Sequence, residues 1–307
     1  MSVVSCVTVT VPATTANLGP GFDCIGAALT LYNEFRFIRV DEGRVTIAVT
    51  GAEAEKVKTD ESNLVYQAFV TFYQHLQQIP PPVKIEIEMD VPLARGLGSS
   101  ATAIVGGLVG ANLLAGEPLS QSQVMELAIA MEGHPDNVVP ALLGGCRLAA
   151  TTDTAWEICE IPWNTNVVPV LAIPDFELST KEARGVLPTQ VSRADAIFNT
   201  AHLGLLLRGL ETANSNWLKA ALQDKLHQPY RKALILGYDA VNSAALEKGA
   251  YGMVISGAGP TLLALTDELH SQAVAAAMAT AWKQEGITAI VRSLSLDTQG
   301  ASSIIQG

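Results

Sequence analysis

The chain has 307 residues, of which 49% are apolar, so it can bury a substantial core and is long enough for two compact lobes. Its formal charge of -11, from 30 acidic and 19 basic side chains, would repel a phosphate backbone, and no run of Lys or Arg offsets that charge locally. We therefore expect no nucleic-acid partner.

The cysteines and the start of the chain favour a reducing compartment. Cys6, Cys24, Cys146 and Cys159 show no Cys-x-x-Cys spacing, which argues against a zinc knuckle and against a disulfide framework. The first residues lack the basic and apolar regions of a secretory signal, and no apolar run approaches the roughly 18 residues that a membrane span needs. We expect a soluble cytoplasmic protein without a membrane partner.

The first half of the chain predicts a mixture of strands and helices. The clearest element is the strand over residues 83–89, because VKIEIEM alternates strictly and places four apolar side chains on one face. The other predicted elements are a strand over 3–11, a β-hairpin over 35–40 and 45–49, a helix from Ser62 to about Gln78, a buried helix from Ser99 to about Ala115, and a helix from Gln121 to about Met131. Ser120 and Gln123 form a capping box for the last of these, and pairs of glycines in the helix that begins at Ser99 predict close packing against its neighbours.

The second half predicts another lobe that begins at the apolar run 167–173, which ends at Pro174. Its remaining predicted elements are helices over 179–187, 192–210 and 231–246, strands over 251–255, 262–265 and 288–291, and one helix before the last strand. The pattern favours an α+β fold with an N-terminal lobe, residues 1–165, on a mixed or antiparallel sheet and a C-terminal lobe, residues 166–307, on an antiparallel sheet.

The segment PLARGLGSSATA, residues 92–103, is the strongest candidate for an anion-binding loop. Gly96 and Gly98 let the backbone approach an anion closely, and the helix that follows offers unpaired N–H groups and a partial positive charge. The hydroxyls of Ser99 and Ser100 can add hydrogen bonds or ligate magnesium. Phosphate is the expected ligand.

Three other interpretations compete for this segment. Gly96, Gly98 and Ala101 match the dinucleotide fingerprint G-x-G-x-x-A, but the preceding strand is amphipathic and no acid ends a second strand about 20 residues on. The lysine of a P-loop and the protein-kinase signature set are missing. A glycine turn needed only for helix packing stays open for the segment taken alone.

Two further loops favour phosphate binding over these alternatives. Residues 256–261, SGAGPT, join two apolar strands through a turn with exposed backbone, and residues 12–26 embed Asn17 and Asp23 among small and apolar side chains. The three loops together resemble the GHMP superfamily of small-molecule kinases over the whole chain. Within it the chain resembles the homoserine kinases in four segments: PATTANLGPGFD at the start, EGHPDN (132–137), STKEARGVLP (179–188) and HQPYR (227–231).

The resemblance implies transfer of the γ-phosphoryl group of ATP to the hydroxyl of L-homoserine in threonine biosynthesis, with Mg²⁺ and a two-lobed fold. It suggests a homodimer, although no feature of the sequence demands one. The implied ATP-binding residues are Asn63, near the adenine base, and Pro92, Leu93, Ala94, Arg95, Gly96, Leu97, Gly98, Ser99, Ser100, Ala101 and Thr102. Ser62 and Asn63 could equally cap the helix that follows them.

An amino acid substrate brings a carboxylate, which suits a planar guanidinium, and an ammonium, which suits Asp, Asn or carbonyl groups. We assign Arg184 and Arg231 to the carboxylate, with Thr180 beside Arg184 at i, i+4, although either Arg alone could be a solvated surface residue. The resemblance adds these substrate contacts: Asn17, Asp23, His134, Asn137 and Gly259. Asp136 could serve there or cap a helix.

Glu126 and Ser100 are the expected metal ligands. Apolar neighbours surround Glu126 on a helical wheel, so we expect its helix to be buried and its carboxylate to need a partner. The resemblance pairs a Glu eight residues before His134 with the second serine of the loop. Glu132 lies closer to His134, and the residues alone do not choose between the two acids.

Phosphoryl transfer requires mainly alignment and charge neutralisation. The first motif contains no lysine, so we expect the hydroxyl to attack directly, held by Asn17, Asp23 and Asn137, with Asp23 and Asp136 as the candidates for a base. Two alternatives stay open: another kinase of the superfamily, such as one of the mevalonate type, and a catalytically silent member that uses the cleft only for binding.

Overall fold

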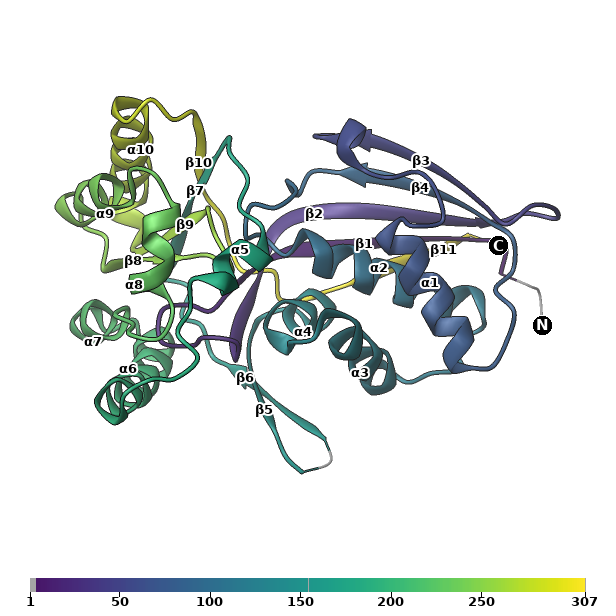
Figure 1. Cartoon of the computed structure of the whole chain (residues 1–307), viewed down its shortest axis with the longest axis horizontal. Coiled ribbons are helices and arrows are strands. Elements are labelled where there is room, and N and C mark those ends of the chain that lie inside the picture. Colours follow the sequence, from purple (N-terminus) through teal and green to yellow (C-terminus); the bar gives the residue numbers. More distant parts are fainter. Residues whose placement is uncertain (1–3, 154, 307) are drawn as a thin grey trace.

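The computed structural model describes residues 4–153 and 155–306, which fold into two lobes that are each built around one β-sheet (Figure 1). Within these residues the first sheet has seven strands: β1 (Cys6–Ala16), β2 (Ile25–Arg39), β3 (Val45–Gly51), β4 (Val83–Met89), β5 (Cys146–Thr151), β6 (Trp156–Ile161) and β11 (Ser302–Gln306). The second sheet has four: β7 (Val168–Pro174), β8 (Gly252–Ile255), β9 (Leu262–Thr266) and β10 (Ala289–Ser293).

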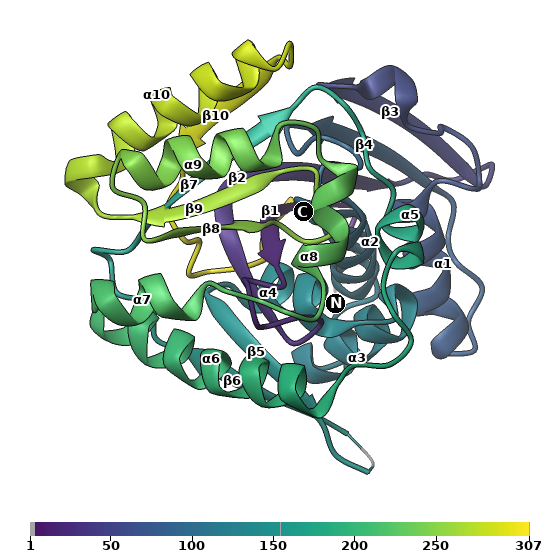
Figure 2. The same ribbon diagram turned by 60° about the vertical axis from the view of Figure 1, so that its left-hand side comes forward.

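Helices cover one face of the first sheet and both faces of the second (Figures 1 and 2). The helices of the first lobe are α1 (Leu64–His75), α2 (Ser99–Leu114), α3 (Gln121–Glu132) and α4 (Pro135–Leu143). Those of the second are α5 (Thr180–Gly185), α6 (Arg193–Thr212), α7 (Ser215–Ala221), α8 (Gln228–Arg231), α9 (Tyr238–Glu247) and α10 (Glu268–Gln284). Short 3₁₀ helices span Ala54–Lys56 and Lys232–Leu234. The α+β fold class and the two-lobed architecture are confirmed.

Helix α2 lies against the sheet of the first lobe through its glycines. A Cβ atom added at Gly106 would lie 2.3 Å from the ring of Phe35, and one added at Gly110 would lie 2.3 Å from the ring of Phe37. The helix can therefore approach β2 only because these positions carry no side chain. This packing confirms the prediction made from the glycine pairs.

The predicted β-hairpin is wrong, because β2 and β3 do not pair with each other. Strand β4 lies between them, antiparallel to β2 and parallel to β3. This register sets Ile87 opposite Phe35 on one side and opposite Val49 on the other, so an apolar row crosses three strands. A short polar connection permits a hairpin, but the cross-strand packing of β4 determines the pairing.

Strand β7 explains the continuous apolar run that begins the second lobe. Val170 and Ala172 pack with residues of α9 and α10, whereas Leu171 and Ile173 pack with residues of α6 and α7. Figure 2 shows the sheet between these two helical layers. A strand covered on both faces needs apolar side chains at every position, and the sequence VPVLAIP supplies them.

Several element boundaries differ from the predicted ones. Strand β1 continues to Ala16 through a register shift after Pro12, where a loop was expected. The helix expected over 231–246 begins at Tyr238, because Gly237 has a φ of 75° and interrupts it. Among the described elements, those without a counterpart in the predictions are α7, α8, β5, β6, β11 and the 3₁₀ helix Ala54–Lys56.

The end of the chain returns to the first lobe, where β11 pairs with β1. The boundary at residue 165 stays a prediction, and a strict division there would assign β11 to the wrong sheet. The four cysteines are free thiols. Among the described helices, none is long and apolar enough to cross a membrane.

Candidate active site

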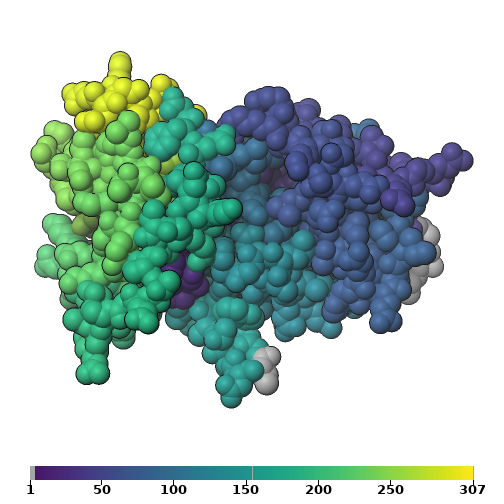
Figure 3. All heavy atoms as spheres, in the orientation of Figure 1, coloured from purple at the N-terminus to yellow at the C-terminus, as the bar shows by residue number. Residues whose placement is uncertain are grey.

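A cavity of about 540 Å³ lies where the two lobes meet, on the face shown in Figure 3. It is lined by the loop before α2, by the segment that leads into α1, by the end of α3 and start of α4, and by residues of α5 and of the 256–261 turn. The three loops singled out in the sequence therefore converge.

Direct hydrogen bonds join these loops. The Thr14 amide donates to the Leu97 carbonyl at 3.1 Å, and the Gly257 amide donates to the Ala16 carbonyl at 3.0 Å. The Ser256 hydroxyl donates to the Gly96 carbonyl at 2.7 Å. The three motifs thus form one backbone framework.

The start of α2 has the geometry of an anion-binding site. Gly98 is its N-cap, with a φ of 67°, and no side chain caps the first turn, so its N–H groups are available to a ligand. A Cβ at Gly98 would lie 2.0 Å from the Thr14 hydroxyl oxygen, and one at Gly96 would lie 2.2 Å from the Ser256 carbonyl oxygen. The glycines therefore serve loop packing as well as anion access.

Not every residue of the predicted phosphate loop reaches the cavity. Those that line it are Leu93, Ala94, Arg95, Gly96, Gly98, Ser99 and Ser100. Those that do not are Pro92, Leu97, Ala101 and Thr102. Side chains of Leu97, Ala101 and Thr102 are buried in the core, because the loop and the first turn of α2 must anchor one side in the protein to present the other.

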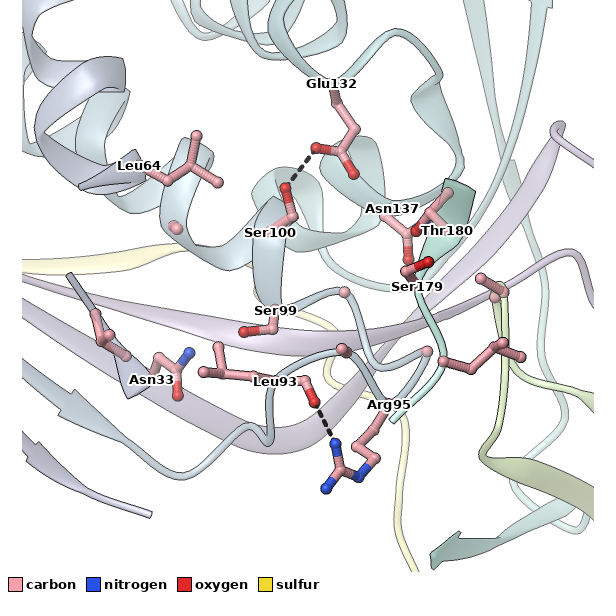
Figure 4. A pocket seen from close by; sticks show the side chains of 18 of the residues that line it. Asn33, Leu64, Leu93, Arg95, Ser99, Ser100, Glu132, Asn137, Ser179 and Thr180 are labelled. Carbon is pink, nitrogen blue, oxygen red and sulfur yellow. Dashed lines mark hydrogen bonds between the residues drawn. The ribbon is translucent and has the colours of Figure 1, made fainter. Parts of the chain in front are cut away.

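Arg95 lines the cavity, but its guanidinium is turned to the protein. It donates to the carbonyl oxygens of Leu93 at 2.8 Å, Pro174 at 3.0 Å and Asp175 at 2.9 Å, and it pairs with Glu53 at 3.3 Å. The first of these bonds is visible in Figure 4. Arg95 thus connects the loop to the end of β7, and its guanidinium nitrogens are already hydrogen-bonded to protein groups rather than directed at a nucleotide.

Asn63 caps α1, as the alternative interpretation allowed. Its side-chain oxygen accepts from the amides of Val65 and Tyr66, and its amide group donates to the Lys58 carbonyl at 2.6 Å. With its polar atoms committed in this way, the side chain has little left with which to bind adenine. The neighbouring part of the cavity is apolar and was not predicted; it is lined by Phe35, Val57, Leu64, Val65, Ile87 and Met89. The alternating patterns of β2 and β4 carry the only sequence signal for it.

The acid that contacts Ser100 is Glu132 and not Glu126. Ser100 Oγ donates to a carboxylate oxygen of Glu132 at 2.9 Å (Figure 4). Glu126 is exposed and does not line the cavity, whereas the buried residues of α3 are Val124, Ala128 and Ile129. The expectation that Glu126 is buried and pairs with Ser100 is therefore wrong.

The environment of Glu132 suits a hard cation. Burial raises the pKa of its carboxyl group, since the ionised form loses solvent. Mg²⁺ usually binds through one or two carboxylates together with substrate phosphates and waters. No group of three His, Cys, Asp or Glu side chains with metal-ligand spacing occurs among the described residues, so a metal here would need phosphate oxygens.

Asn17 and Asp23 both line the cavity and contact each other. Asn17 donates from Nδ2 to the Gly257 carbonyl at 2.6 Å and accepts from the Asp23 amide at 2.9 Å. The Asp23 carboxylate forms a bidentate pair with Arg184, with distances of 2.8 and 3.0 Å. Thr180 lines the same region. The predicted substrate residues are therefore close together, and one pair of opposite charges is already formed.

His134, Asp136 and Asn137 form a polar cluster at the start of α4. Nδ1 of His134 lies 3.0 Å from the Asp136 carboxylate, and this interaction raises the pKa of the imidazole. Asn137 donates to the same carboxylate at 3.3 Å and accepts from the Thr14 hydroxyl at 2.8 Å. Asp136 therefore orients its neighbours, and the helix has no side-chain cap.

Arg231 is buried, with 1% of its surface exposed, so it is not a solvated surface residue. It donates to the carbonyl oxygens of Ala183 at 3.1 Å and Gly257 at 3.0 Å, and it lines the cavity. Gly259 does not line the cavity. Gly257 and Ala258 occupy that place, because the Gly259 amide turns inward to the Ser256 carbonyl at 2.8 Å.

His227 is fully buried behind Arg231 and is held neutral. Its Nε2 lies 3.0 Å from the Gly19 carbonyl, which requires N–H there, and its Nδ1 faces the Arg231 guanidinium at 3.4 Å. Burial lowers the pKa of this imidazole to about 4. A proton on Nδ1 would place an imidazolium next to the Arg231 guanidinium.

Acid should therefore destabilise the fold through His227. The unfolded chain takes up a proton below a pH of about 6.5, whereas the folded chain resists it down to about 4. The stability due to neutral His227 is complete above the first value and is lost as the pH falls through the second, a change of roughly 3 kcal/mol. Denaturant titrations should show a smaller loss between these pH values for His227→Gln than for the parent, and His75→Gln, at an exposed position, is the control. Equal slopes for all three would contradict the argument.

The fold and the cavity define a nucleotide-dependent small-molecule kinase of the GHMP type. Family models agree: GHMP kinases N terminal domain matches residues 63–145, and GHMP kinases C terminal matches residues 205–284. The homoserine kinase of Nostoc punctiforme is 80% identical over 303 residues, which cover 99% of this chain and 100% of that protein. The homoserine kinase of Microchaete diplosiphon is 80% identical over the full length of both chains. The chain belongs to the homoserine kinase family.

Solved structures agree with this assignment. The crystal structure of homoserine kinase from Cytophaga hutchinsonii matches with a TM-score of 0.90 and 31% identity, and the match covers 99% of both chains. Mevalonate kinase of L. major, solved in complex with R-mevalonate, matches with a TM-score of 0.73 at 14% identity over 95% of both chains, which shows a shared fold alone.

Proposed function

We propose that the chain transfers the γ-phosphoryl group of ATP to the side-chain hydroxyl of L-homoserine, giving O-phospho-L-homoserine and ADP. One observation carries this proposal: a single cavity joins an uncapped helix start at Ser99 to the guanidinium groups of Arg184 and Arg231. The first suits phosphate and the second suits the carboxylate of an amino acid.

The nucleotide would lie along the first lobe. Its base would enter the apolar region around Phe35 and Met89, and its phosphates would face the amides of Gly98 and the first turn of α2. Ser100 and Glu132 would hold Mg²⁺ together with phosphate oxygens. When bound, the ion neutralises charge that develops on the transferred group and on ADP.

Homoserine, the phosphoryl acceptor, would break the ion pair between Asp23 and Arg184 and bind both residues. The homoserine carboxylate would replace Asp23 at Arg184 and also contact Arg231, and the released Asp23 would receive the substrate ammonium. Thr180 would add a contact to the carboxylate, and His134 a contact to the substrate. A ligand with both charges leaves neither protein group unpaired.

The hydroxyl would attack the γ-phosphorus directly, held by Asn17, Asp23 and Asn137. Lys56, the first lysine of the chain, is held by Glu53 and Glu177 at 2.7 Å each and is not available for this step. Asp23 and Asp136 are the carboxylates that could accept the proton; without substrate, Asp23 pairs with Arg184 and Asp136 with His134.

We further propose that the protein acts in the cytoplasm, as the spacing of its cysteines favours, and that it forms a homodimer, as the resemblance suggests. The division near residue 165 into an ATP-binding N-terminal lobe and a C-terminal lobe belongs to this proposal, with β11 as an addition to the first sheet.

A coupled assay of ADP release tests the substrate. With Mg-ATP, kcat/KM for L-homoserine should exceed the values for mevalonate and galactose by about 10²-fold or more, because a site built for both charges penalises ligands that lack one or both. Serine and threonine carry both charges, but their hydroxyl lies one carbon closer to the α-carbon and is misplaced for attack, so kcat/KM for them should be lower as well. Turnover of mevalonate or galactose without homoserine would indicate another kinase of the superfamily. Nucleotide binding without turnover of any acceptor would indicate a silent member.

A further inference from the structure

Asn33 is a buried polar residue beside the phosphate loop to which neither the sequence nor the proposed reaction assigned a role. It lies in β2, is 1% exposed, and contributes to the cavity wall (Figure 4). Its side-chain oxygen accepts from the amides of Asp90 and Val91, each at 2.9 Å. Its Nδ2 donates to the Thr102 hydroxyl at 2.9 Å. A single side chain therefore holds both ends of the loop.

The bond to Thr102 continues into the first turn of α2. The Thr102 hydroxyl donates to the Ser99 carbonyl at 2.9 Å, so Asn33 is connected to the residue that begins the helix. Thr102 is fully buried, and the hydrogen bonds of Asn33 to the Val91 amide and the Thr102 hydroxyl are buried. Loss of the Asn33 side chain would leave the amides of Asp90 and Val91 without their acceptor, and the Thr102 hydroxyl would keep only its bond to the Ser99 carbonyl.

The loop between these two anchors needs external support. Ala94 has a φ of 51°, Gly96 of 73° and Gly98 of 67°, so three residues adopt left-handed conformations within five positions. Such conformations persist where the surrounding structure fixes them, and the cost is greatest for the residue with a Cβ, Ala94. The direction of the loop amides therefore depends on where its two ends are held.

We propose that Asn33 is a positioning residue for phosphoryl transfer: by fixing Val91 at one end of the loop and Thr102 at the other, it aligns the loop amides and Ser99 with the γ-phosphoryl group. This inference rests on the proposed function. A purely structural role would instead affect the free energy of unfolding and leave turnover by the folded protein unchanged. The two roles make different predictions for kcat.

Asn33→Ala should lower kcat by about 10²-fold, because a displacement of about 1 Å in a group that aligns the reacting atoms costs this much. KM for L-homoserine should change less than about threefold, since Arg184 and Arg231 lie on other elements, while the Kd of Mg-ADP should rise several-fold. Asn33→Asp keeps two acceptor contacts and loses the donor to Thr102. It should have intermediate activity and gives a second test if the alanine variant does not fold.

Asn112 provides a matched control on the same helix. It lies near the far end of α2, where its Nδ2 donates to the Leu119 carbonyl at 3.0 Å and its oxygen accepts from the Leu119 amide at 3.1 Å. Asn112→Ala should lower the melting temperature as the loss of a loop anchor does, yet leave kcat, the Kd of Mg-ADP and KM at the parent values.

Thr102→Val removes the hydroxyl that joins Asn33 to Ser99 and should lower kcat, whereas Thr102→Ser keeps that hydroxyl and should keep kcat near the parent value. Because both residues act through one hydrogen bond, the double variant Asn33→Ala/Thr102→Val should lose no more kcat than Asn33→Ala alone. A folded Asn33→Ala with kcat within threefold of the parent would overturn the inference, as would an equal loss in Asn112→Ala. Failure of the parent itself to phosphorylate homoserine would instead refute the proposed function, and the Kd of Mg-ADP would still test Asn33.

Discussion

Glu132→Gln is expected to lower kcat by about 10³-fold, because the neutral amide removes several kcal/mol of cation-assisted charge stabilisation in the transition state. The amide can still accept from Ser100, so the fold should be retained. The apparent affinity for Mg²⁺ should fall as well, and kcat measured against Mg²⁺ concentration separates the two effects. Because the pKa of this carboxyl in the parent is raised by burial, the parent and the Glu132→Gln variant should be compared over a range of pH.

Glu126→Gln is the matched control for this experiment. Glu126 lies on the same helix, α3, but is exposed and outside the cavity, so its replacement should leave kcat and the Mg²⁺ dependence at the parent values. The opposite result, with Glu126→Gln inactive and Glu132→Gln active, would restore the pairing inferred from the family resemblance and refute the one based on geometry.

The two acids show where sequence reasoning fails on a helix. The wheel around Glu126 contains apolar residues in almost every direction, yet only Val124, Ala128 and Ile129 are buried there, while Ala130 is exposed. Small apolar residues are common on solvent-facing helix surfaces, so their presence does not measure burial. Which face of α3 packs depends on the position of α2, which no local pattern encodes.

The sequence predicted an element correctly where the interactions that form it lie within the element itself. The alternation of VKIEIEM predicted β4 with its correct ends, and the capping box at Ser120 predicted the start of α3. The pairing of β2 with β4 was not predictable in this way, because their cross-strand contacts join residues about 50 positions apart. The roles of Arg95 and Asn33 were hidden for the same reason, since their partners lie on other elements.

Loss of the ion pair between Asp23 and Arg184 is expected to have the second large effect on activity. Arg184→Gln should lower kcat/KM for L-homoserine by about 10³-fold, because the substrate carboxylate loses a partner and Asp23 loses its counter-charge at the same time. Most of the loss should fall on KM. Arg208→Gln, which removes an exposed Arg that pairs with Glu211 on α6, should leave both parameters unchanged.

A double-mutant cycle tests whether the substrate exchanges partners with this pair. If homoserine must break the ion pair between Asp23 and Arg184 to bind both groups, each single variant also removes the cost of breaking that pair. Asp23→Asn/Arg184→Gln should therefore lose more kcat/KM than the product of the two single losses. Losses that multiply would mean that the two groups bind the substrate independently. An Asp23→Asn variant that keeps its kcat would, in addition, exclude this carboxylate as the base, so the same set of variants also tests whether the hydroxyl attacks without one.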